Sequence, residues 1–367
     1  SETGQGEKRV IISFRATGEG HISSIEFRTG VLDKNNNLLI EPVGSMLEEA
    51  EHIRRHVYEK ESFKKKLDEM KDFDAIIPSS LILDRLNDKF TDSELRKCIE
   101  EARKSIYLAF EKEILFNQII WLATSHYELE YSLDTNISER VIFPISANEK
   151  NGIEDARFVK FKNEDGTFIY YATYTAYDGV SILPKMLDTK DFYHFRILPL
   201  HGEIAQNKGM ALFPRKVNGK YAMLCRLDGF NNYIAFSDNI SIWREAKLLQ
   251  EPKFPWELIQ IGNCGSPIET ADGWLVITHG VGPMREYVLG ASLFDLQNPQ
   301  IEIGRLKSPL LIPNAEEREG YVPNVVYSCG SMIHNNDLII PYAMSDFAST
   351  YATVDLRELL NELKNSQ

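Results

Sequence analysis

Five segments beyond residue 150 are rich in Gly, Pro and polar residues and poor in aliphatic residues. Segments of this kind form loops, and loops on a rigid scaffold often carry binding and catalytic side chains. They are therefore the first places to search for chemistry. The segments are NGIEDAR (151–157), NKGMALFPRK (207–216), GNCGSPIET (262–270), THGVGPMREY (278–287) and EREGYVPNVVY (317–327).

These segments and their neighbours supply carboxylates, cations, a histidine and tyrosines. Carboxylates that face cations around a polar opening suit a sugar together with an anion. Each residue also has a structural alternative: Asp155 as a turn residue that bonds its own backbone, His279 as a satisfied core histidine. Arg226 and Lys208 have ordinary surface cations as theirs. The candidates are Glu154, Asp155, Glu269, Glu317, Asp346, Arg157, Lys208, Arg215, Arg226, Arg285, His279, Tyr287 and Tyr321.

The composition is that of a soluble globular protein, with 43% hydrophobic and 26% charged residues among 367. Its 41 Lys+Arg and 54 Asp+Glu give a net charge of −13, which repels polyanions, so we expect no nucleic-acid partner. The chain has no apolar stretch near the roughly 18 residues that cross a bilayer, and its first residues lack a signal-peptide core. We expect no membrane association and a cytoplasmic location; a signal peptide upstream of this chain is the alternative.

The four cysteines, Cys98, Cys225, Cys264 and Cys329, lie far apart. They form no CxxC pair, and no histidine stands near them at zinc-ligand spacing. We interpret them as reduced, buried thiols. The sequence predicts no metal site and no cofactor.

Short β-rich runs alternate with Gly/Asn/Asp turns from Arg140 to Leu356. The hairpin signals are NEDG, VNGK, TADG and HNND, and each stands between apolar runs. Antiparallel units that recur every roughly 45 to 55 residues are typical of a β-propeller, whose blades pack on their neighbours. A β-sandwich is the rival fold, but its strands do not form such repeated modules. We predict an all-β propeller with the polar loops at one mouth of its channel.

Residues 44–125 differ from the β-rich sequence on both sides, because charged runs there carry helical apolar spacing. The TDSE stretch has the form of a capping box, with Thr91 or Asp92 as the cap. We interpret this region as a helical insert within a single domain that spans 1–367. A solvated buttress is the favoured role; a lid over the channel mouth and a subunit contact in a homo-oligomer are the alternatives. Residues 356–364 predict a short terminal helix.

Several of these segments, taken in order, resemble the mannoside phosphorylases and mannosidases of glycoside hydrolase family 130. They are NGIEDARF, the LFPRK…GKY…R series, GSPIET..GWLVITHGV, the Y…GASLFDL..P run and EGYVPNVVYSCG. The resemblance covers about residues 8 to 356 without the insert. It implies a five-bladed propeller that acts on β-mannosides with inversion. It also implies that Asp155, in the G-x-x-D-x-R segment, donates the proton, by way of the 3-hydroxyl of the mannosyl unit in subsite −1.

The resemblance implies inorganic phosphate as the nucleophile and co-substrate. A general acid must start protonated, and neighbouring Glu154 in a semi-enclosed mouth raises the pKa of Asp155. The residues expected at the phosphate are Arg15, Lys208, Arg226, His279 and Tyr287, and those expected at the mannoside are Glu154, Arg157, Glu269, Glu317 and Asp346.

Two features depart from the family pattern. Gln260 stands where many phosphorylases carry a lysine, which removes one cation from the phosphate side. The chain also begins after the FNP-type segment of the family, so we expect that the first blade is incomplete.

Three functions follow from these residues. The first is phosphorolysis of a β-mannoside to α-mannose 1-phosphate. The second is inverting hydrolysis, with Glu269 or Glu317 as the base. The third is noncatalytic sugar binding. The linkage, the +1 sugar and the oligomeric state stay open.

Overall fold

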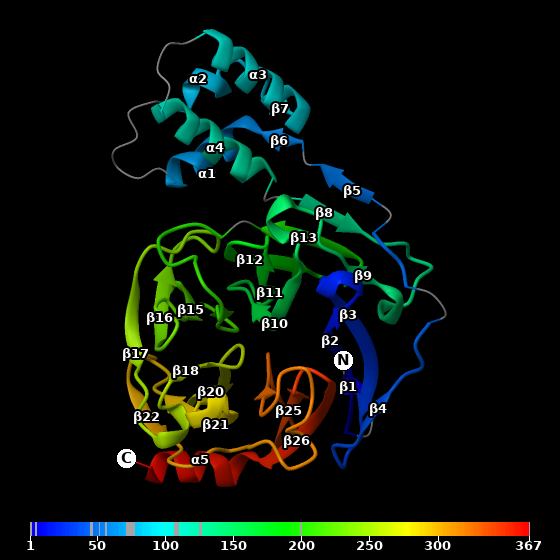
Figure 1. The fold of residues 1–367 in the computed structure, drawn as a ribbon, viewed down its shortest axis with the longest axis vertical. Helices are drawn as coiled ribbons and strands as arrows, with labels where there is room; N and C mark the ends of the chain where they lie inside the picture. The colour runs from blue at the N-terminus through cyan, green and yellow to red at the C-terminus, as the bar shows by residue number, and fades with distance from the viewer. Residues whose placement is uncertain are drawn as a thin grey trace.

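The computed structural model is a ring of five antiparallel sheets (Figure 1). Each sheet is one blade whose faces pack on its neighbours, so the fold is the predicted five-bladed β-propeller. We number the blades one to five in chain order. The structure describes residues 2–3, 6–44, 47–50, 52–55, 57–70, 78–105, 110–124, 127–198 and 200–366.

Blades one and two differ in how they are extended. Blade one has the strand order β1-β2-β3-β4, with β9 paired to β3, so four consecutive strands stand where we expected an incomplete blade. Blade two is widened by β8 and β5, which flank the insert. The strands are β1 (Glu2–Thr3), β2 (Glu7–Thr17), β3 (Ser23–Leu32), β4 (Leu38–Ile40), β9 (Val141–Ile142), β10 (Ile153–Lys162), β11 (Phe168–Tyr177), β12 (Ile182–Thr189), β13 (His194–Leu198), β8 (Tyr127–Glu130) and β5 (His52–Arg55).

Blades three to five complete the ring. Blade three is a four-stranded meander. In blade four, β18 and β19 both pair with β20, and in blade five, β23 and β24 both pair with β25. The strands are β14 (Ala211–Leu212), β15 (Tyr221–Cys225), β16 (Asn232–Ser237), β17 (Ala246–Gln250), β18 (Gln260–Asn263), β19 (Ile268–Thr270), β20 (Gly273–Val281), β21 (Tyr287–Phe294), β22 (Glu302–Arg305), β23 (Val326–Tyr327), β24 (Met332–His334), β25 (Asp337–Met344) and β26 (Ala348–Asp355).

The predicted hairpins lie where their turn residues indicated. NEDG joins β10 to β11, VNGK lies between β14 and β15, TADG joins β19 to β20, and HNND joins β24 to β25. The predicted terminal helix is α5 (Leu356–Asn365), whose first turn is capped by the carboxylate of Asp355, which accepts from the amide of Glu358 at 2.9 Å. Short 3₁₀ turns, η1 (Glu19–His21), η2 (Ile137–Glu139), η3 (Ala147–Glu149), η4 (Pro255–Glu257) and η5 (Pro283–Arg285), lie in the loops.

Strand β20 explains why the inner strands of this fold read as continuous apolar runs. Side chains alternate between the two faces of a strand, and both faces of a blade are covered by neighbouring blades. Trp274 and Val276 join the buried cluster between blades three and four, whereas Leu275 and Ile277 join the cluster between blades four and five. One strand therefore supplies two cores.

The junction between blades five and one is different. Buried apolar clusters fill the other four junctions, but none of those formed by the described residues joins these two blades. Polar contacts close the ring instead. Asn36 donates to Asp337 at 2.5 Å, the amide of Leu38 donates to the Tyr351 hydroxyl at 3.1 Å, and His334 donates to the carbonyl of Asp33 at 3.1 Å.

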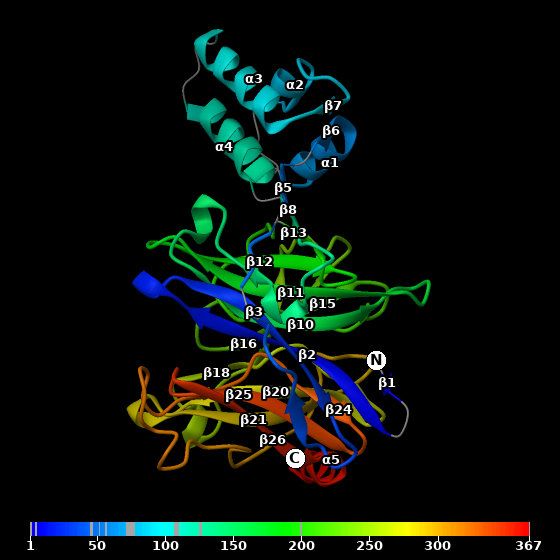
Figure 2. The ribbon, with the colours of Figure 1, turned by 90° about the vertical axis from the view of Figure 1, so that its right-hand side faces the viewer.

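The helical insert stands off the outer edge of blade two (Figures 1 and 2). It therefore does not lie over the centre of the ring, as a lid over the channel mouth would. Its helical part begins later than residue 44, because β5 already pairs with β8. Its elements are β6 (Tyr58–Glu59), α1 (Lys60–Met70), α2 (Ser80–Leu83), β7 (Lys89–Phe90), α3 (Asp92–Ser105) and α4 (Phe110–Thr124).

The insert has a core of its own. Phe63, Ile82, Phe90 and Phe116 are all buried in one cluster, which contains no residue of the propeller. The insert is thus a small packed unit rather than a set of helices lying on the propeller. The predicted capping box is confirmed with Thr91 as the cap: its amide donates to Glu94 at 2.8 Å, and its hydroxyl accepts from the Glu94 amide at 3.3 Å. In the described ranges, no helix is long and apolar enough to cross a membrane.

The cysteines are unpaired thiols. Cys225 and Cys264 are buried as predicted, but Cys98 and Cys329 are only half-buried. Within the described part of the chain, no group of three or more His, Cys, Asp or Glu residues is arranged to hold a metal ion.

A buried carboxylate, Glu149, organises the inner end of blade two. It accepts the hydroxyls of Tyr127 at 2.9 Å and Tyr174 at 2.8 Å and pairs with Lys185 at 3.1 Å. Its carbonyl accepts from the amide of Gly152 at 2.7 Å. Burial alone would raise the pKa of Glu149, but the charge of Lys185 and the hydrogen bonds outweigh it, so the pKa is lowered. Through Tyr127, Glu149 connects β8, the strand that follows the insert, to the loop that leads into β10.

We expect Glu149→Gln to destabilise the protein by about 3 kcal/mol, because the variant leaves the charge of Lys185 buried without its partner. The lowered pKa means that the contribution of Glu149 is present above its ordinary value of 4.5 and is lost as the pH falls. Urea unfolding as a function of pH measures both effects. Glu164→Gln serves as the control. It removes an ion pair with Lys216 at the surface, where the Glu164 side chain is 73% exposed. Equal stability of the two variants would contradict the role of Glu149.

Candidate active site

Asp155 lies at the start of β10, where the strand is irregular. The pairing of β10 with β11 shifts register between Glu154 and Arg157, which is a β-bulge, and Asp155 has a φ of 57°. Bulges re-aim side chains, and a left-handed conformation at a non-glycine residue is costly and concentrates at functional sites. The preceding Gly152 has a φ of +121° and packs so closely on Ser23 of blade one that a Cβ would meet its hydroxyl at 2.6 Å. The loop is thereby held against the neighbouring blade.

The electrostatic surroundings of Asp155 favour its protonated form. Burial raises the pKa of Asp155, and the negative charge of Glu154 raises it further. Lys208, Arg157 and Arg15 act in the opposite direction, but the net shift is upward. The structure thus gives Asp155 the property that we expected of a general acid.

Glu154 and Arg15 link three blades beside Asp155. Arg15, on β2, contacts Glu154 at 3.3 Å and Asp346 of blade five at 3.5 Å. Lys208, in the loop before β14, binds the other oxygen of Glu154. These predicted residues are therefore brought together, and their charges alternate around Asp155.

Arg157 forms the floor of the site. It is 2% exposed and donates to the side chain of Asn263 and to the hydroxyl of Tyr327 at 2.7 Å. Asn263, which is 1% exposed, also donates to the carbonyl of Gly209 at 2.8 Å. Arg157 lies on β10 of blade two, and its guanidinium group is held by Asn263 of blade four and Tyr327 of blade five.

A second cluster, which we call the cationic wall, consists of Arg226, His279 and Gln260. His279 lies 3.4 Å from NH1 of Arg226. With its oxygen turned toward both, the Gln260 amide accepts from Arg226 and, at 2.9 Å, from Nε2 of His279, and its nitrogen donates to the carbonyl of Gly229 at 3.2 Å. Burial, then Arg226 and Arg157, holds the pKa of His279 well below its usual range, so the imidazole is neutral. Nε of Arg226 is buried and has no partner among the described residues.

The ring of His279 is held from both sides. Tyr287, at the start of β21, stacks on it at 6.2 Å and 12°, and the Tyr327 ring lies 5.2 Å away. Trp256 packs against the neighbouring backbone at Gly280 and Gly290, where a Cβ would meet its indole at 2.4 Å. Glycine is therefore required at these two positions for the indole to approach the strands.

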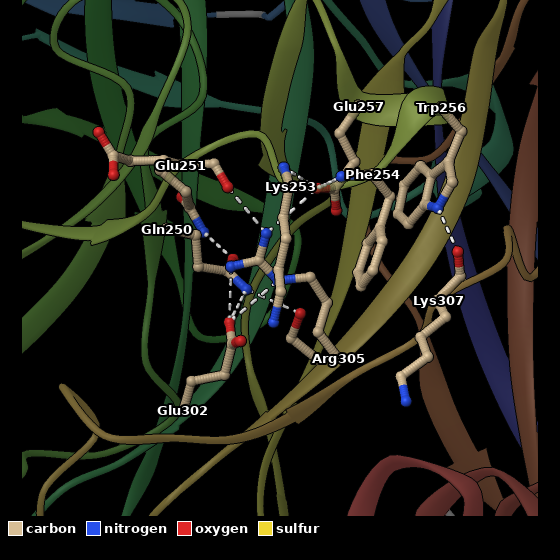
Figure 3. A network of polar contacts seen from close by, with 11 residues as sticks. Gln250, Glu251, Lys253, Phe254, Trp256, Glu257, Glu302, Arg305 and Lys307 are labelled. Atoms are coloured by element: carbon tan, nitrogen blue, oxygen red, sulfur yellow. Dashed lines mark hydrogen bonds and ion pairs between the residues drawn. The ribbon is translucent and has the colours of Figure 1, made fainter. Parts of the chain in front are cut away.

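A polar network holds Trp256 in this place (Figure 3). The indole nitrogen donates to the carbonyl of Lys307 at 3.1 Å. Glu257 accepts from the amide of Lys253 at 2.8 Å and from Arg305 at 3.2 Å, and Arg305 also binds Glu302 at 2.9 Å. The segment between blades three and four is thus attached to the outer strand of blade four, and it presses Trp256 against the strand that bears His279.

Two predicted carboxylates have other contacts. Arg215 binds Glu269 through two hydrogen bonds of 2.7 Å, at the Trp274 end of β20 rather than at the His279 end. Glu317 accepts from the amide of Asn314 at 2.9 Å and the hydroxyl of Tyr342 at 2.8 Å. Glu269 therefore forms an ion pair between blades three and four, and Glu317 attaches its loop to Tyr342 of β25. The sequence alone does not reveal these partners of Glu269 and Glu317.

Asn263 and Tyr327 were missed as site residues. Both lie inside segments that the sequence marks as loops with polar character, GNCGSPIET and EREGYVPNVVY. Nothing in the sequence distinguishes a buried amide that holds Arg157 from an ordinary turn residue. Their role became visible only from the contacts of Arg157.

The fold and site together define a class of protein. One carboxyl group with a raised pKa lies among alternating charges, and a wall with a neutral imidazole and an unpaired guanidinium nitrogen stands near it. Such groups suit a carbohydrate-active enzyme whose ligands are a sugar and an anion.

Comparisons with known proteins identify the family. A model of glycoside hydrolase family 130, described as beta-1,4-mannooligosaccharide phosphorylase, matches residues 134–365. The chain is 35% identical over 229 residues to a 1,2-beta-oligomannan phosphorylase of Thermoanaerobacter sp., an alignment that covers 59% of this chain and 74% of that protein. It is 27% identical over 289 residues to a beta-1,2-mannobiose phosphorylase of Listeria innocua, covering 76% and 78%. The chain belongs to glycoside hydrolase family 130 and is an enzyme.

A solved structure supports the fold. The beta-1,2-mannobiose phosphorylase of Listeria innocua, in complex with beta-1,2-mannobiose, superposes with a TM-score of 0.56 at 20% identity. The match covers 100% of this chain and 95% of that chain. At this identity the likeness concerns the propeller and not its substrate.

The pKa of Asp155 should fall in Glu154→Gln. The substitution removes the negative charge that raises this pKa, and it releases Lys208 to act on Asp155 alone. Carbon-13 NMR titration of the carboxyl groups, assigned with Asp155→Asn, measures the shift. Glu130→Gln removes a carboxylate on the outer strand β8 of blade two and should leave the titration unchanged. An unshifted Asp155 signal in Glu154→Gln would show that burial alone sets its pKa.

Proposed function

We propose that this enzyme is an inverting β-mannoside phosphorylase that releases α-mannose 1-phosphate. The relatives named above carry out phosphorolysis of β-linked mannosides, and inorganic phosphate is the co-substrate of such enzymes. The observation that carries the proposal is the buried, unpartnered Nε of Arg226 beside neutral His279. A buried donor without an acceptor is unfavourable unless a ligand supplies one, and an anion does so best.

In the proposed reaction Asp155 donates a proton through the 3-hydroxyl of the mannosyl unit to the glycosidic oxygen. The bond from the anomeric carbon to that oxygen breaks, and the leaving sugar takes the proton. A phosphate oxygen forms the new bond on the opposite face, which converts the β-linkage into an α-phosphate. Asp155 ends as a carboxylate, and Lys208, Arg157 and Arg15 stabilise that charge.

The cationic wall is the proposed phosphate site. Arg226 offers its Nε donor to the anion, while neutral His279, whose one N–H donates to Gln260, orients the wall without adding the charge of an imidazolium. Tyr287 holds the plane of that ring and takes part in the site. Lys208 binds Glu154 and adds a positive charge near Asp155.

The mannosyl unit is expected on the other side of Asp155. Glu154 and Asp346 present carboxylate oxygens there, oriented by Arg15, and such groups accept hydrogen bonds from sugar hydroxyls. Arg157, held by Asn263 and Tyr327, adds a buried positive charge near Asp155.

Hydrolysis is less well supported. It requires a carboxylate that activates water on the far face of the sugar. Of the two candidates, Glu269 is bound by Arg215, and Glu317 accepts hydrogen bonds from Tyr342 and from a backbone amide. The cationic wall fits phosphate in place of such a base.

Product analysis tests the proposal directly. The protein is incubated with β-1,2- and β-1,4-mannobiose, with and without inorganic phosphate, and the products are separated by ion-exchange chromatography. We expect α-mannose 1-phosphate only with phosphate, and a loss of about 10³-fold in Asp155→Asn. Free mannose at equal rates in both reactions would instead establish a hydrolase.

Arg226→Ala should raise the KM for phosphate about 10- to 100-fold, because it removes a charge-assisted hydrogen bond to the anion. The KM for the mannoside should change little. Arg215→Ala removes a guanidinium group that pairs with Glu269 at the other end of blade four, so it is the matched control. A phosphate KM that stays at the wild-type value in Arg226→Ala would remove this residue from the phosphate site.

A further inference from the structure

A stacked aromatic pair stands exposed where blades one and five meet. The rings of His21, in the turn between β2 and β3, and Tyr321, in the loop before β23, lie 5.4 Å apart with an interplanar angle of 24°. The side chain of Tyr321 is 70% exposed. Two stacked rings at the surface offer a flat apolar face on which a ligand ring can pack.

The pair is close to the Arg15–Asp346 ion pair. His21 follows the end of β2, the strand that bears Arg15. The residue after Tyr321 donates its amide to the carbonyl of Ser345 at 3.0 Å, and Asp346 follows directly. This bond joins the loop that bears Tyr321 to the turn that bears Asp346.

The backbone of these loops is strained. His21, Ser345 and Asp346 have φ values of 59°, 46° and 55°, in the left-handed region that non-glycine residues rarely adopt. Each costs roughly 1 kcal/mol or more and persists only where the surroundings impose it. The ring pair is consequently held in position before any ligand arrives, which lowers the entropic cost of binding.

The pair lies where blades one and five meet, whereas Arg226 follows β15 of blade three and His279 and Gln260 lie on β20 and β18 of blade four. Figure 1 shows blades one and five, with β2 and β25, on the right and blades three and four, with β15 and β20, on the left. In an inverting displacement the nucleophile and the leaving group occupy opposite faces of the anomeric carbon. If phosphate occupies the wall, the leaving sugar departs toward blades one and five.

We propose that His21 and Tyr321 form a platform for the pyranose ring on the leaving-group side of the scissile bond. The ligand is the acceptor sugar of a β-mannoside, whose C–H face packs on the Tyr321 ring while its hydroxyls stay in water. This inference rests on the proposed function, since it assigns the acceptor half of the same site.

The test uses the synthetic direction, with α-mannose 1-phosphate as donor and mannose or β-mannobiose as acceptor. Tyr321→Ala should raise the acceptor KM about five- to tenfold, because the stacking surface is lost. The KM for α-mannose 1-phosphate should stay within about twofold, since the mannosyl unit of the donor is proposed at Glu154 and Asp346 and not on the Tyr321 ring. Tyr321→Phe keeps the ring and should behave like the wild type.

Phe168→Ala is the control, because Phe168 is 48% exposed on β11 beside the NEDG turn, away from Asp155. An unchanged acceptor KM in Tyr321→Ala would overturn the platform, as would an equal rise of both KM values.

If the wild type shows no synthesis or phosphorolysis, the proposed function fails, and saturation-transfer NMR with β-1,2-mannobiose then decides the platform separately. Transfer to the sugar ring protons that is lost in Tyr321→Ala and kept in Phe168→Ala supports it. Equal transfer in both variants, or none in the wild type, overturns it.

Discussion

The site depends on the two ion pairs that the guanidinium group of Arg15 makes with Glu154 and Asp346. This group comes from blade one, binds Glu154 of blade two and Asp346 of blade five, and so joins the first and last blades of the ring beside the candidate acid. The blades must close in the correct register for these three groups to meet. The raised pKa of Asp155 depends on this closure, because the charges of Glu154 and Arg15 act on it in opposite directions.

The seam that carries Arg15 is also the one without a buried apolar cluster among the described residues. Apolar packing is tolerant of small shifts, whereas hydrogen bonds such as Asn36 to Asp337 demand a particular register. A polar seam therefore sets the relative height of blades one and five more narrowly than hydrophobic burial would. His21 precedes β3 and Asp346 follows β25, so both lie at the opposite ends of two strands that this seam brings together.

The sequence predicted those parts of the structure that local rules determine. The hairpins follow from Asn/Asp-Gly turns, and the cap of α3 follows from Thr91 and Glu94. It did not predict what depends on long-range partners. Glu269 reads as a free loop carboxylate until Arg215 is seen to bind it, and Asn263 gains its role only from Arg157. The independent core of the insert was missed for the same reason, since helical spacing does not tell whether a face packs on the propeller or on a neighbouring helix.

Gln260 shows how an amide takes part in a cluster where the family pattern has a cation. A lysine there would add a positive charge beside Arg226 and His279, whereas the amide adds none. It does, however, give an oxygen to both side chains and a donor to the carbonyl of Gly229, so it orients the wall that the extra charge would have reinforced. The neutral state of His279 is consistent with this arrangement, because the guanidinium groups of Arg226 and Arg157 already disfavour its protonation. In the proposed function, orientation of fewer charges substitutes for their number, and Nε of Arg226 is the donor that would meet the anion.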